Sequence, residues 1–223
     1  SWESTLGYYR AINKGIRETL GGLHSARIAM VSVDFEPLER LQHAGDWQAI
    51  ASLLSAAAID VEAAGADFLL ICTNTMHRVA PEIEAAIGIP ILHIADATAE
   101  VLVSAGIESV GLLGTAFTME QDFYKGRLED RFGLRVLVPD AGDRQLVHRV
   151  IYEELCLGET KPSSKAEYLR IIDGLAANGA EAVILGCTEI GMLVRQADTS
   201  VRLLDTTAIH AAKAVEYAAQ DRG

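Results

Sequence analysis

Two of the three cysteines in this chain stand in the same local pattern. Cys72 follows the apolar run 68–71, Cys187 follows the apolar run 182–186, and a threonine comes directly after each cysteine. A thiolate can accept a proton and a neutral thiol can deliver one. Two thiols on opposite sides of one carbon can therefore invert a stereocentre, because one removes a proton while the other delivers a proton from behind.

Polar residues follow both cysteines. Thr73, Asn74 and Thr75 come after Cys72, and Thr188 comes after Cys187. Their hydroxyl, amide and free backbone N–H groups are donors suited to a carboxylate, and such donors stabilise the negative charge that develops when a neighbouring carbon loses a proton. Helix starts expected after both cysteines would also lower the thiol pKa from its ordinary value of about 8.5.

A single cysteine at the end of an apolar strand belongs to a packed core more often than to a catalytic site. The repeated pattern favours the functional interpretation for Cys72 and Cys187 as a pair. Cys156 lies in a helical pattern without polar neighbours of this kind, and we interpret it as a packing residue. The three cysteines have no C-x-x-C spacing, so we expect neither a disulfide framework nor a metal site, and unpaired thiols fit the reducing cytoplasm.

Short aliphatic runs alternate with helical patterns along the whole chain, which predicts βα units and a parallel sheet. Strands are expected at 27–33, 68–72, 91–94, 109–114, 135–138, 182–186 and 201–205. Helices are expected at 3–20, 47–64, 81–86, 97–105, 120–132, 144–155, 168–177 and 207–219.

Two segments of the chain are repeated. The stretch 64–74 resembles 178–189, and the back half of 111–124 resembles 1–9, although the first copy lacks the strand that should precede its helix. We therefore expect an α/β fold of two pseudo-symmetric lobes, each a parallel sheet flanked by helices, and a further strand ahead of Ser1. The lobes are predicted over 1–95 and 96–205, with a C-terminal helical segment, 206–223, completing the first. Because ligands bind beyond the carboxyl ends of parallel strands, both cysteines should face one cleft between the lobes.

The composition limits the kind of partner. The 223 residues are 50% hydrophobic and 22% charged, with a formal net charge of −12. This field repels nucleic acid and anionic lipid headgroups, and the apolar runs are too short to cross a bilayer. We expect a small-molecule substrate, no nucleic-acid partner and no membrane span, and the composition is compatible with a homodimer.

No cofactor is expected either. No lysine stands in the phosphate-binding setting that a pyridoxal Schiff base requires, and the stretch 111–114 lacks the spacing of a dinucleotide or phosphate loop. His77 and His93 are expected to be hydrogen-bonded structural residues rather than a source of positive charge for a thiolate.

Five motifs, in order along the chain, resemble the aspartate/glutamate racemase family, close to its bacterial broad-specificity amino-acid racemase branch. The resemblance implies a cofactor-independent racemase in which Cys72 and Cys187 are the paired catalytic bases. The motifs are Ser-Trp-Glu-Ser-Thr at 1–5, Cys-Thr-Asn-Thr-Met-His at 72–77, His-Ile-Ala-Asp-Ala-Thr at 93–98, Leu-Gly-Thr-Ala-Phe-Thr-Met at 113–119 and Gly-Cys-Thr-Glu-Ile at 186–190.

The resemblance also implies which residues bind the substrate. Asn74 and Thr75 match the family residues that hold the α-carboxylate beside the first cysteine, and Thr188 matches their counterpart beside the second. Thr115 and Thr118 fall in a loop that lines the cleft in the family.

Two positions depart from the family's specific members. Gln42 occupies the region where aspartate-specific members place a basic anchor for the substrate side chain, and Glu189 replaces the histidine that glutamate-specific relatives carry after Gly-Cys-Thr. These departures imply that the substrate is aspartate, glutamate or a broader range of amino acids.

Two further functions stay open at this point. The first is a single-cysteine isomerase or decarboxylase of the same fold that acts on a small dicarboxylic acid. The second is an amino-acid-binding protein that keeps the cleft without turnover.

Overall fold

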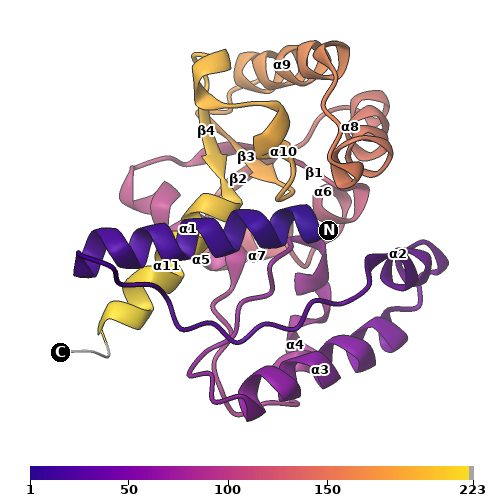
Figure 1. Ribbon diagram of the computed structural model, residues 1–223. Helices are drawn as coiled ribbons and strands as arrows, with labels where there is room; N and C mark the ends of the chain where they lie inside the picture. Colours follow the sequence, from indigo (N-terminus) through magenta and orange to yellow (C-terminus); the bar gives the residue numbers. More distant parts are fainter. Residues whose placement is uncertain (221–223) are drawn as a thin grey trace.

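The computed structural model describes residues 1–220, whose buried hydrophobic side chains form two clusters. The larger cluster contains residues from Ile94 to Leu204 and surrounds a parallel sheet, whereas the smaller one contains residues from Leu38 to Ile83. Figure 1 shows the corresponding C-terminal lobe at the top and N-terminal lobe at the bottom. The α/β class predicted from the sequence is confirmed.

The sheet lies in the C-terminal lobe, and its four strands have the order β2-β1-β3-β4 with every neighbouring pair parallel. The central strands β1 and β3 are apolar and almost wholly buried, as expected when helices cover both faces of a parallel sheet. The strands are β1 (Ser109–Gly114), β2 (Arg135–Leu137), β3 (Ala182–Gly186) and β4 (Arg202–Asp205).

Glycines let the two central strands approach each other at their carboxyl ends. A Cβ atom on Gly114 would lie 2.7 Å from the backbone oxygen of Gly186, and one on Gly186 would lie 2.8 Å from the backbone oxygen of Leu113. These contacts are too short for any other residue. The loops that follow β1 and β3 therefore begin side by side.

Helices pack against this sheet and join the lobes. Helices α8 and α9 pack against β1, α7 packs against β2, and α11 packs against β3 and β4. The helices of the C-terminal lobe are α5 (Ile94–Ser104), α6 (Ala116–Glu120), α7 (Lys125–Phe132), α8 (Ala141–Glu153), α9 (Pro162–Ala177) and α10 (Ile190–Leu193), with short 3₁₀ turns η2 (Leu155–Leu157) and η3 (Gln196–Asp198). The last helix, α11 (Thr206–Gln220), contacts the sheet and also α1.

The N-terminal lobe contains helices that pack around the smaller cluster. Helix α1 lies along α11, between the two lobes, as Figure 1 shows. The helices of the N-terminal lobe are α1 (Trp2–Leu20), α2 (Phe35–Ala44), α3 (Trp47–Ala63) and α4 (Ala80–Glu84), with the 3₁₀ turn η1 (Thr75–Val79).

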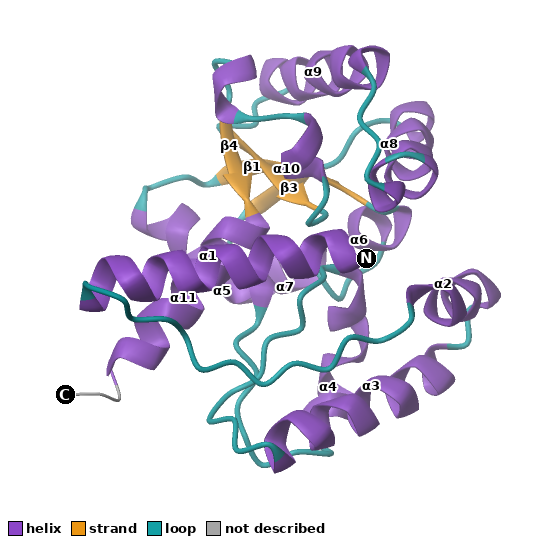
Figure 2. Ribbon diagram, viewed as in Figure 1, coloured by secondary structure: helices purple, strands orange, loops and turns teal. Residues whose placement is uncertain are grey.

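The three strands predicted in the N-terminal lobe are not formed. The segments 27–33 and 68–72 are loops, and 91–93 pairs with 68–72 only through an isolated parallel bridge between Leu69 and Ile91. Figure 2 shows strands in the C-terminal lobe alone within the described chain. The last residue of the predicted third strand, Ile94, begins α5, because the His93 side chain caps that helix by accepting a hydrogen bond from the Ala95 N–H.

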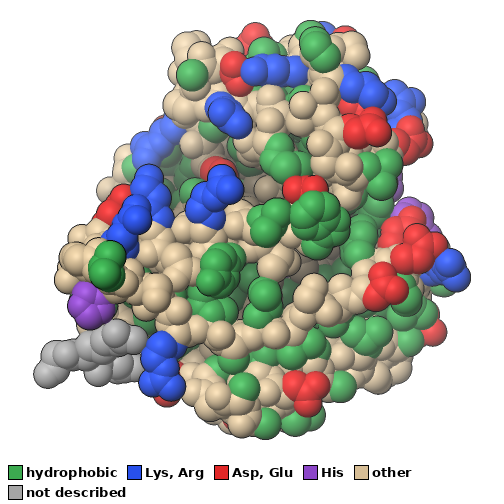
Figure 3. All heavy atoms as spheres, in the orientation of Figure 1, with side chains coloured by type: hydrophobic (Ala, Val, Ile, Leu, Met, Phe, Trp, Pro, Cys, Tyr) green, Lys and Arg blue, Asp and Glu red, His purple; other side chains and the backbone are tan. Residues whose placement is uncertain are grey.

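A cavity of about 750 Å³ separates the first two of these segments. It is lined by residues 26–33 and 64–73 and by apolar side chains of α1 and α3. Within residues 1–220, no backbone–backbone hydrogen bond involves 27–33. Side chains of this segment, including Ile28, Met30 and Val31, are exposed, and Figure 3 shows hydrophobic side chains gathered over the middle of this face. The segments remain loops because the cavity leaves no backbone between 27–33 and 68–72 with which either could pair.

The predicted helices differ from the observed ones in extent. The helix expected at 120–132 forms only from Lys125, as α7, and its first residue ends α6, because Gln121 has an extended backbone and Tyr124, fully buried in the larger cluster, lies between the two helices. Helix α9 begins at Pro162, ahead of the predicted 168–177. Helix α2 was not predicted, although Asp34 caps its first turn by accepting a hydrogen bond from the Glu36 N–H.

We propose that the lobes extend over 1–95 and 96–205 and that 206–223 completes the first, with residues 221–223 outside the described part. Helix α5 supplies the first residues of the larger cluster, and α11 packs on α1, which supports both boundaries.

The repeat indicates what kind of segment the cavity could accommodate. Since 64–74 matches 178–189, the cavity beside 68–72 corresponds to the place of β1 beside β3. We predict that a copy of Ile107–Gly114 joined ahead of Ser1 would enter the cavity as a parallel strand. The backbone N–H groups of Leu70 and Cys72 point to the side opposite the Leu69–Ile91 bridge, where the added strand would lie. Because that strand would accept hydrogen bonds from them, their amide hydrogen exchange should slow at least about tenfold. Exchange measured by mass spectrometry provides the test.

The matched control carries the same added segment with aspartate at both leucine positions. It should leave exchange at 68–72 unchanged, because a charged strand would not enter an apolar cavity. Equal exchange in the two variants would contradict the prediction.

Candidate active site

Cys72 lies at the end of the extended segment 68–72, at the edge of the cavity and one turn before η1. Its side chain is partly exposed, but protein surrounds it on most sides. Burial raises the pKa of the Cys72 thiol to about 12, and the positive charge of the Ser1 amino group opposes this effect.

Cys187 follows the last residue of β3 and is also partly exposed. Its thiol donates a hydrogen bond to Glu189 Oε2, with an Sγ to oxygen distance of 3.0 Å. Burial raises the pKa of Cys187 well above its ordinary value, and the negative charge of Glu189 raises it further. The backbone N–H of Glu189 acts in the opposite direction by hydrogen bonding to the sulfur.

The expected lowering of thiol pKa by helix starts is therefore not observed. The turn after Cys72 is the short 3₁₀ helix η1, and α10, after Cys187, has only four residues and an anion, Glu189, at its N-cap position. These elements provide too little positive potential to offset burial. Both thiols are protonated at neutral pH in the unliganded protein.

Glu189 is buried and has every lone pair direction occupied. Oε1 accepts hydrogen bonds from the hydroxyls of Ser1 at 2.6 Å and Ser4 at 2.7 Å, and Oε2 accepts from Thr188 at 2.7 Å as well as from Cys187. Burial alone would raise the pKa of Glu189, but the Ser1 amino group and these hydrogen bonds lower it to about 2. The side chain is therefore a carboxylate at working pH.

The start of α1 lies next to Thr188, which follows Cys187, and near enough to Cys72 for the Ser1 charge to act on its thiol. Ser4 Oγ lies 2.7 Å from Thr188 Oγ1. The Ser1 amino group acts on the pKa of both Cys72 and Glu189. The buried Tyr8 hydroxyl has a pKa raised first by burial and then by the charges of Cys72 and Glu189 among others. The start of α1 thus stands between the neighbourhoods of the two thiols.

Three of the predicted threonines meet where the lobes join. The Thr75 hydroxyl lies 2.9 Å from that of Thr115 and 3.4 Å from that of Thr118, and the latter two lie 3.2 Å apart. All three side chains are buried. Thr75 comes from the N-terminal lobe and the other two come from the loop after β1 and from α6, so this cluster spans the lobes.

Asn74 makes a second connection across the lobes. Its Nδ2 donates to Thr206 Oγ1 at 3.1 Å, and the Thr206 hydroxyl donates in turn to the Leu185 carbonyl at 2.8 Å. These bonds fix the orientation of the amide, and Asn74 Oδ1 is left buried without a hydrogen-bond partner among the described residues. A buried acceptor of this kind is suited to a ligand donor.

Gln42 and Thr73 lie apart from the threonine cluster. Gln42 is buried in α2, where its Oε1 accepts a hydrogen bond from the Tyr152 hydroxyl of α8 at 3.3 Å. Tyr152 is close enough to Cys187 for the thiolate charge to raise the pKa of its phenol, after burial. The Thr73 backbone carbonyl accepts a hydrogen bond from His77 Nδ1 at 2.7 Å.

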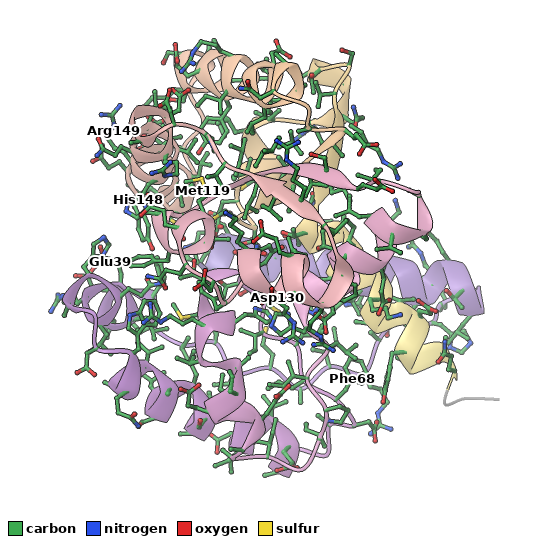
Figure 4. All side chains as sticks on the ribbon, turned by 180° about the vertical axis from the view of Figure 1, so that it is seen from behind. Glu39, Phe68, Met119, Asp130, His148 and Arg149 are labelled. Atoms are coloured by element: carbon green, nitrogen blue, oxygen red, sulfur yellow. The ribbon has the colours of Figure 1, made fainter. Side chains whose placement is uncertain are left out.

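Side chains of α2 and α8 continue this contact between the lobes. The His43 ring lies 6.1 Å from that of His148 and 5.3 Å from that of Tyr152, measured between ring centroids. His43 also pairs with Glu39. Figure 4 shows Glu39 on α2 and His148 on α8, on facing elements of the two lobes.

The two histidines that the sequence singled out are structural. His77 and His93 are buried, and burial lowers both pKa values, that of His93 to about 3. His77 accepts a hydrogen bond from the Ile94 N–H, and its ring packs against that of His93. Both imidazole rings are therefore neutral at neutral pH and do not stabilise a thiolate by positive charge.

Sequence reasoning missed three polar residues of this region: Ser4, Tyr152 and Thr206. Thr206 directly follows β4, so the rule that ligand sites lie beyond the carboxyl ends of strands could have found it. Ser4 and Tyr152 lie within helices, and no local pattern indicates that they contact residues of the other lobe.

The chain has clear relatives. A sequence model of the Asp/Glu/Hydantoin racemase family matches residues 1–214. The chain belongs to this family.

Solved structures agree with this assignment. A putative Asp/Glu racemase from Yersinia pestis is 55% identical, with 99% of this chain and 96% of that chain covered and a TM-score of 0.91. An aspartate racemase homologue from Pyrococcus horikoshii OT3 is 34% identical over 98% and 95% of the two chains, with a TM-score of 0.83. Glutamate racemase from Francisella tularensis, 15% identical over 95% and 77%, shares the fold with a TM-score of 0.65.

Within residues 1–220, no group of three or more His, Cys, Asp or Glu side chains is arranged to hold a metal ion. None of the helices in the same range is both long and apolar enough to cross a membrane.

The buried histidine of α11 gives a pH prediction. The His210 ring accepts a hydrogen bond from the Tyr8 hydroxyl, and burial lowers its pKa to about 4. The pKa of histidine in an unfolded chain is about 6.5. As the pH falls from 7 to 5, His210 therefore becomes protonated in the unfolded chain but stays neutral in the folded protein. Between pH 7 and pH 5, His210 should thus reduce the free energy of unfolding by about 2 kcal/mol.

Urea unfolding of His210→Gln should show a smaller loss of stability over this range by that amount. The exposed His24 provides a control, and His24→Gln should retain the wild-type pH dependence. An unchanged pH dependence in His210→Gln would contradict the prediction.

Proposed function

We propose that this protein is a cofactor-independent amino-acid racemase in which Cys72 and Cys187 act on opposite faces of the substrate α-carbon. One observation carries the proposal. Each lobe contributes one partly exposed thiol at the carboxyl end of a strand or extended segment. The start of α1 connects their surroundings, because the Ser1 amino charge acts on Cys72 and the Ser1 hydroxyl donates to Glu189, which accepts the Cys187 thiol. Family membership and the relatives described as racemases support the same reaction class.

The proposed reaction conserves atoms and electrons. A thiolate accepts the α-proton from one face, and the C–H electron pair remains on the α-carbon and its carboxylate. The opposite thiol then donates its proton to the other face. The product has inverted configuration, and the thiol and thiolate have exchanged places.

The raised thiol pKa values are compatible with this role. An α-proton of an amino acid is weakly acidic, and a thiolate of higher pKa is a stronger base. The cost is that few molecules carry the thiolate before substrate binds. The α-ammonium group of a substrate brings positive charge beside the thiols, which favours ionisation of one of them.

The polar residues have distinct roles in this proposal. Asn74 takes the substrate ammonium rather than the α-carboxylate that the family resemblance implied, because its Nδ2 already donates to Thr206 and only the acceptor Oδ1 has no partner among the described residues. Thr73, Thr75, Thr115, Thr118 and Thr188 supply hydroxyl or backbone donors for the carboxylate, where negative charge increases in the transition state.

In this proposal the substrate side chain contacts two uncharged residues, Gln42 and Tyr152. Gln42 and Tyr152 are hydrogen-bonded to each other near Cys187, and neither carries charge at neutral pH. This arrangement supports aspartate, glutamate or a broader range of amino acids as substrates. The reduced thiols that the reaction needs are those of a cytoplasmic protein.

The decisive measurement is deuterium incorporation at the α-carbon of L- and D-amino acids in heavy water. The wild-type protein should label both enantiomers. Cys72→Ala and Cys187→Ala should each lose racemisation by at least about a hundredfold, because each lacks one of the two acid–base groups. Each variant should still exchange one enantiomer, and the two variants should exchange opposite ones.

Cys156→Ala is the matched control. Cys156 is partly buried against the larger cluster and should be replaceable with near wild-type racemisation. Retained racemisation in either active-site variant would contradict the mechanism. Turnover of a small dicarboxylic acid that needs one cysteine would indicate the isomerase or decarboxylase, and binding without exchange would indicate an amino-acid-binding protein.

Asn74→Ala should raise KM by about tenfold or more with a smaller change in kcat, because it removes an acceptor for the charged ammonium. Thr206→Ser retains the hydroxyl that orients the amide and should keep KM close to wild type. Steady-state kinetics with the best substrate of the panel provide the measurement. An Asn74→Ala variant with unchanged KM would place the ammonium elsewhere.

A further inference from the structure

The two thiols differ in their charged surroundings. The Cys187 thiol donates its hydrogen bond to a carboxylate, whereas the Cys72 thiol donates a long one, of 4.0 Å, to the neutral Leu70 carbonyl. Glu189 is 3% exposed, so solvent does little to screen its charge. A thiol that donates to a buried anion is stabilised, and the corresponding thiolate would face that anion at about 3 Å.

We propose that Glu189 is a positioning residue that holds Cys187 in the protonated form, so that the first ionisation in the active site occurs at Cys72. The proposal rests on the racemase function proposed above, because it assigns different resting states to the two thiols of that mechanism. In this assignment the unliganded site has Cys187 as the acid, and Cys72 becomes the base.

The groups that face each thiol are consistent with this assignment. Around Cys187 they are Glu189, Cys156 of η2, and the phenols of Tyr152 on α8 and Tyr168 on α9, none of which brings positive charge. The Ser1 amino group and hydroxyl face Glu189 from α1. Around Cys72 the neighbours are the Ser1 amino group and the Tyr8 phenol.

The hydroxyls around Glu189 explain why it can remain charged while buried. Ser1, Ser4 and Thr188 donate three hydrogen bonds to its oxygens. These donors stabilise the carboxylate and orient Oε2 toward the Cys187 sulfur. Glu189 therefore does not compete with Cys187 for the substrate proton, because protonating it would sacrifice those bonds.

Alkylation of each cysteine by iodoacetamide, followed by mass spectrometry as a function of pH, tests the proposal without requiring turnover. Only thiolates react, so the rate reports the ionised fraction of each sulfur. In the wild-type protein Cys72 should react at lower pH than Cys187. In Glu189→Gln, loss of the anion should lower the pKa of Cys187 and increase its alkylation at pH 8 by about tenfold or more. Cys72 should change little.

Ser4→Ala is the matched control, because it removes one hydrogen bond to Glu189 but leaves the carboxylate charge in place. Its Cys187 profile should stay close to wild type. The kcat/KM of Glu189→Gln should fall equally from L- and D-substrate, since the equilibrium constant of racemisation is one. A Cys187 alkylation profile that is identical in Glu189→Gln and wild type would overturn the proposal.

The outcomes for this residue and for the proposed function are separable. Wild-type protein that incorporates no α-deuterium would overturn the racemase function whatever the alkylation shows. If the wild-type protein racemises normally but iodoacetamide alkylates Cys187 at lower pH than Cys72, only the assignment of Cys187 as the acid and Cys72 as the base is overturned.

Discussion

The structure depends on polar groups that are buried where the two lobes meet. Ser4 contacts Thr188, Thr75 contacts Thr115, and Asn74 is linked through the Thr206 hydroxyl to the Leu185 carbonyl, so that each contact joins the two lobes. A buried polar group without a partner costs roughly 1–3 kcal/mol. The lobes must therefore sit in the one relative position that pairs these groups, and this position also sets the place of each thiol.

The same burial has an electrostatic consequence. Removing water from Cys72 and Cys187 raises both thiol pKa values, and the anion at Glu189 makes the two sites unequal. The free protein thus contains weakly ionised thiols of high basicity rather than a ready thiolate. A cationic substrate group is the natural compensation, because it is absent from the empty site and present during the proposed reaction.

The two lobes illustrate how a strand depends on its neighbours. In the C-terminal lobe, β1 lies between β2 and β3 and completes a four-stranded sheet. In the N-terminal lobe, segments of similar apolar character lie beside a cavity and remain loops. The difference does not come from local propensity, since strand hydrogen bonds require a second backbone at the right distance.

The sequence by itself determined the α/β class, the strands of the C-terminal lobe, most helices and the family. These features follow from short patterns such as the apolar run 182–186 and the Cys-Thr repeat at 72 and 187. Only the tertiary structure decided which polar groups meet, which direction the thiol pKa values take, and that 27–33 and 68–72 lack strand partners. The reason is physical: Ser4 and Thr188 are 184 residues apart in sequence, and burial and pairing at such separations arise only when distant segments have packed together.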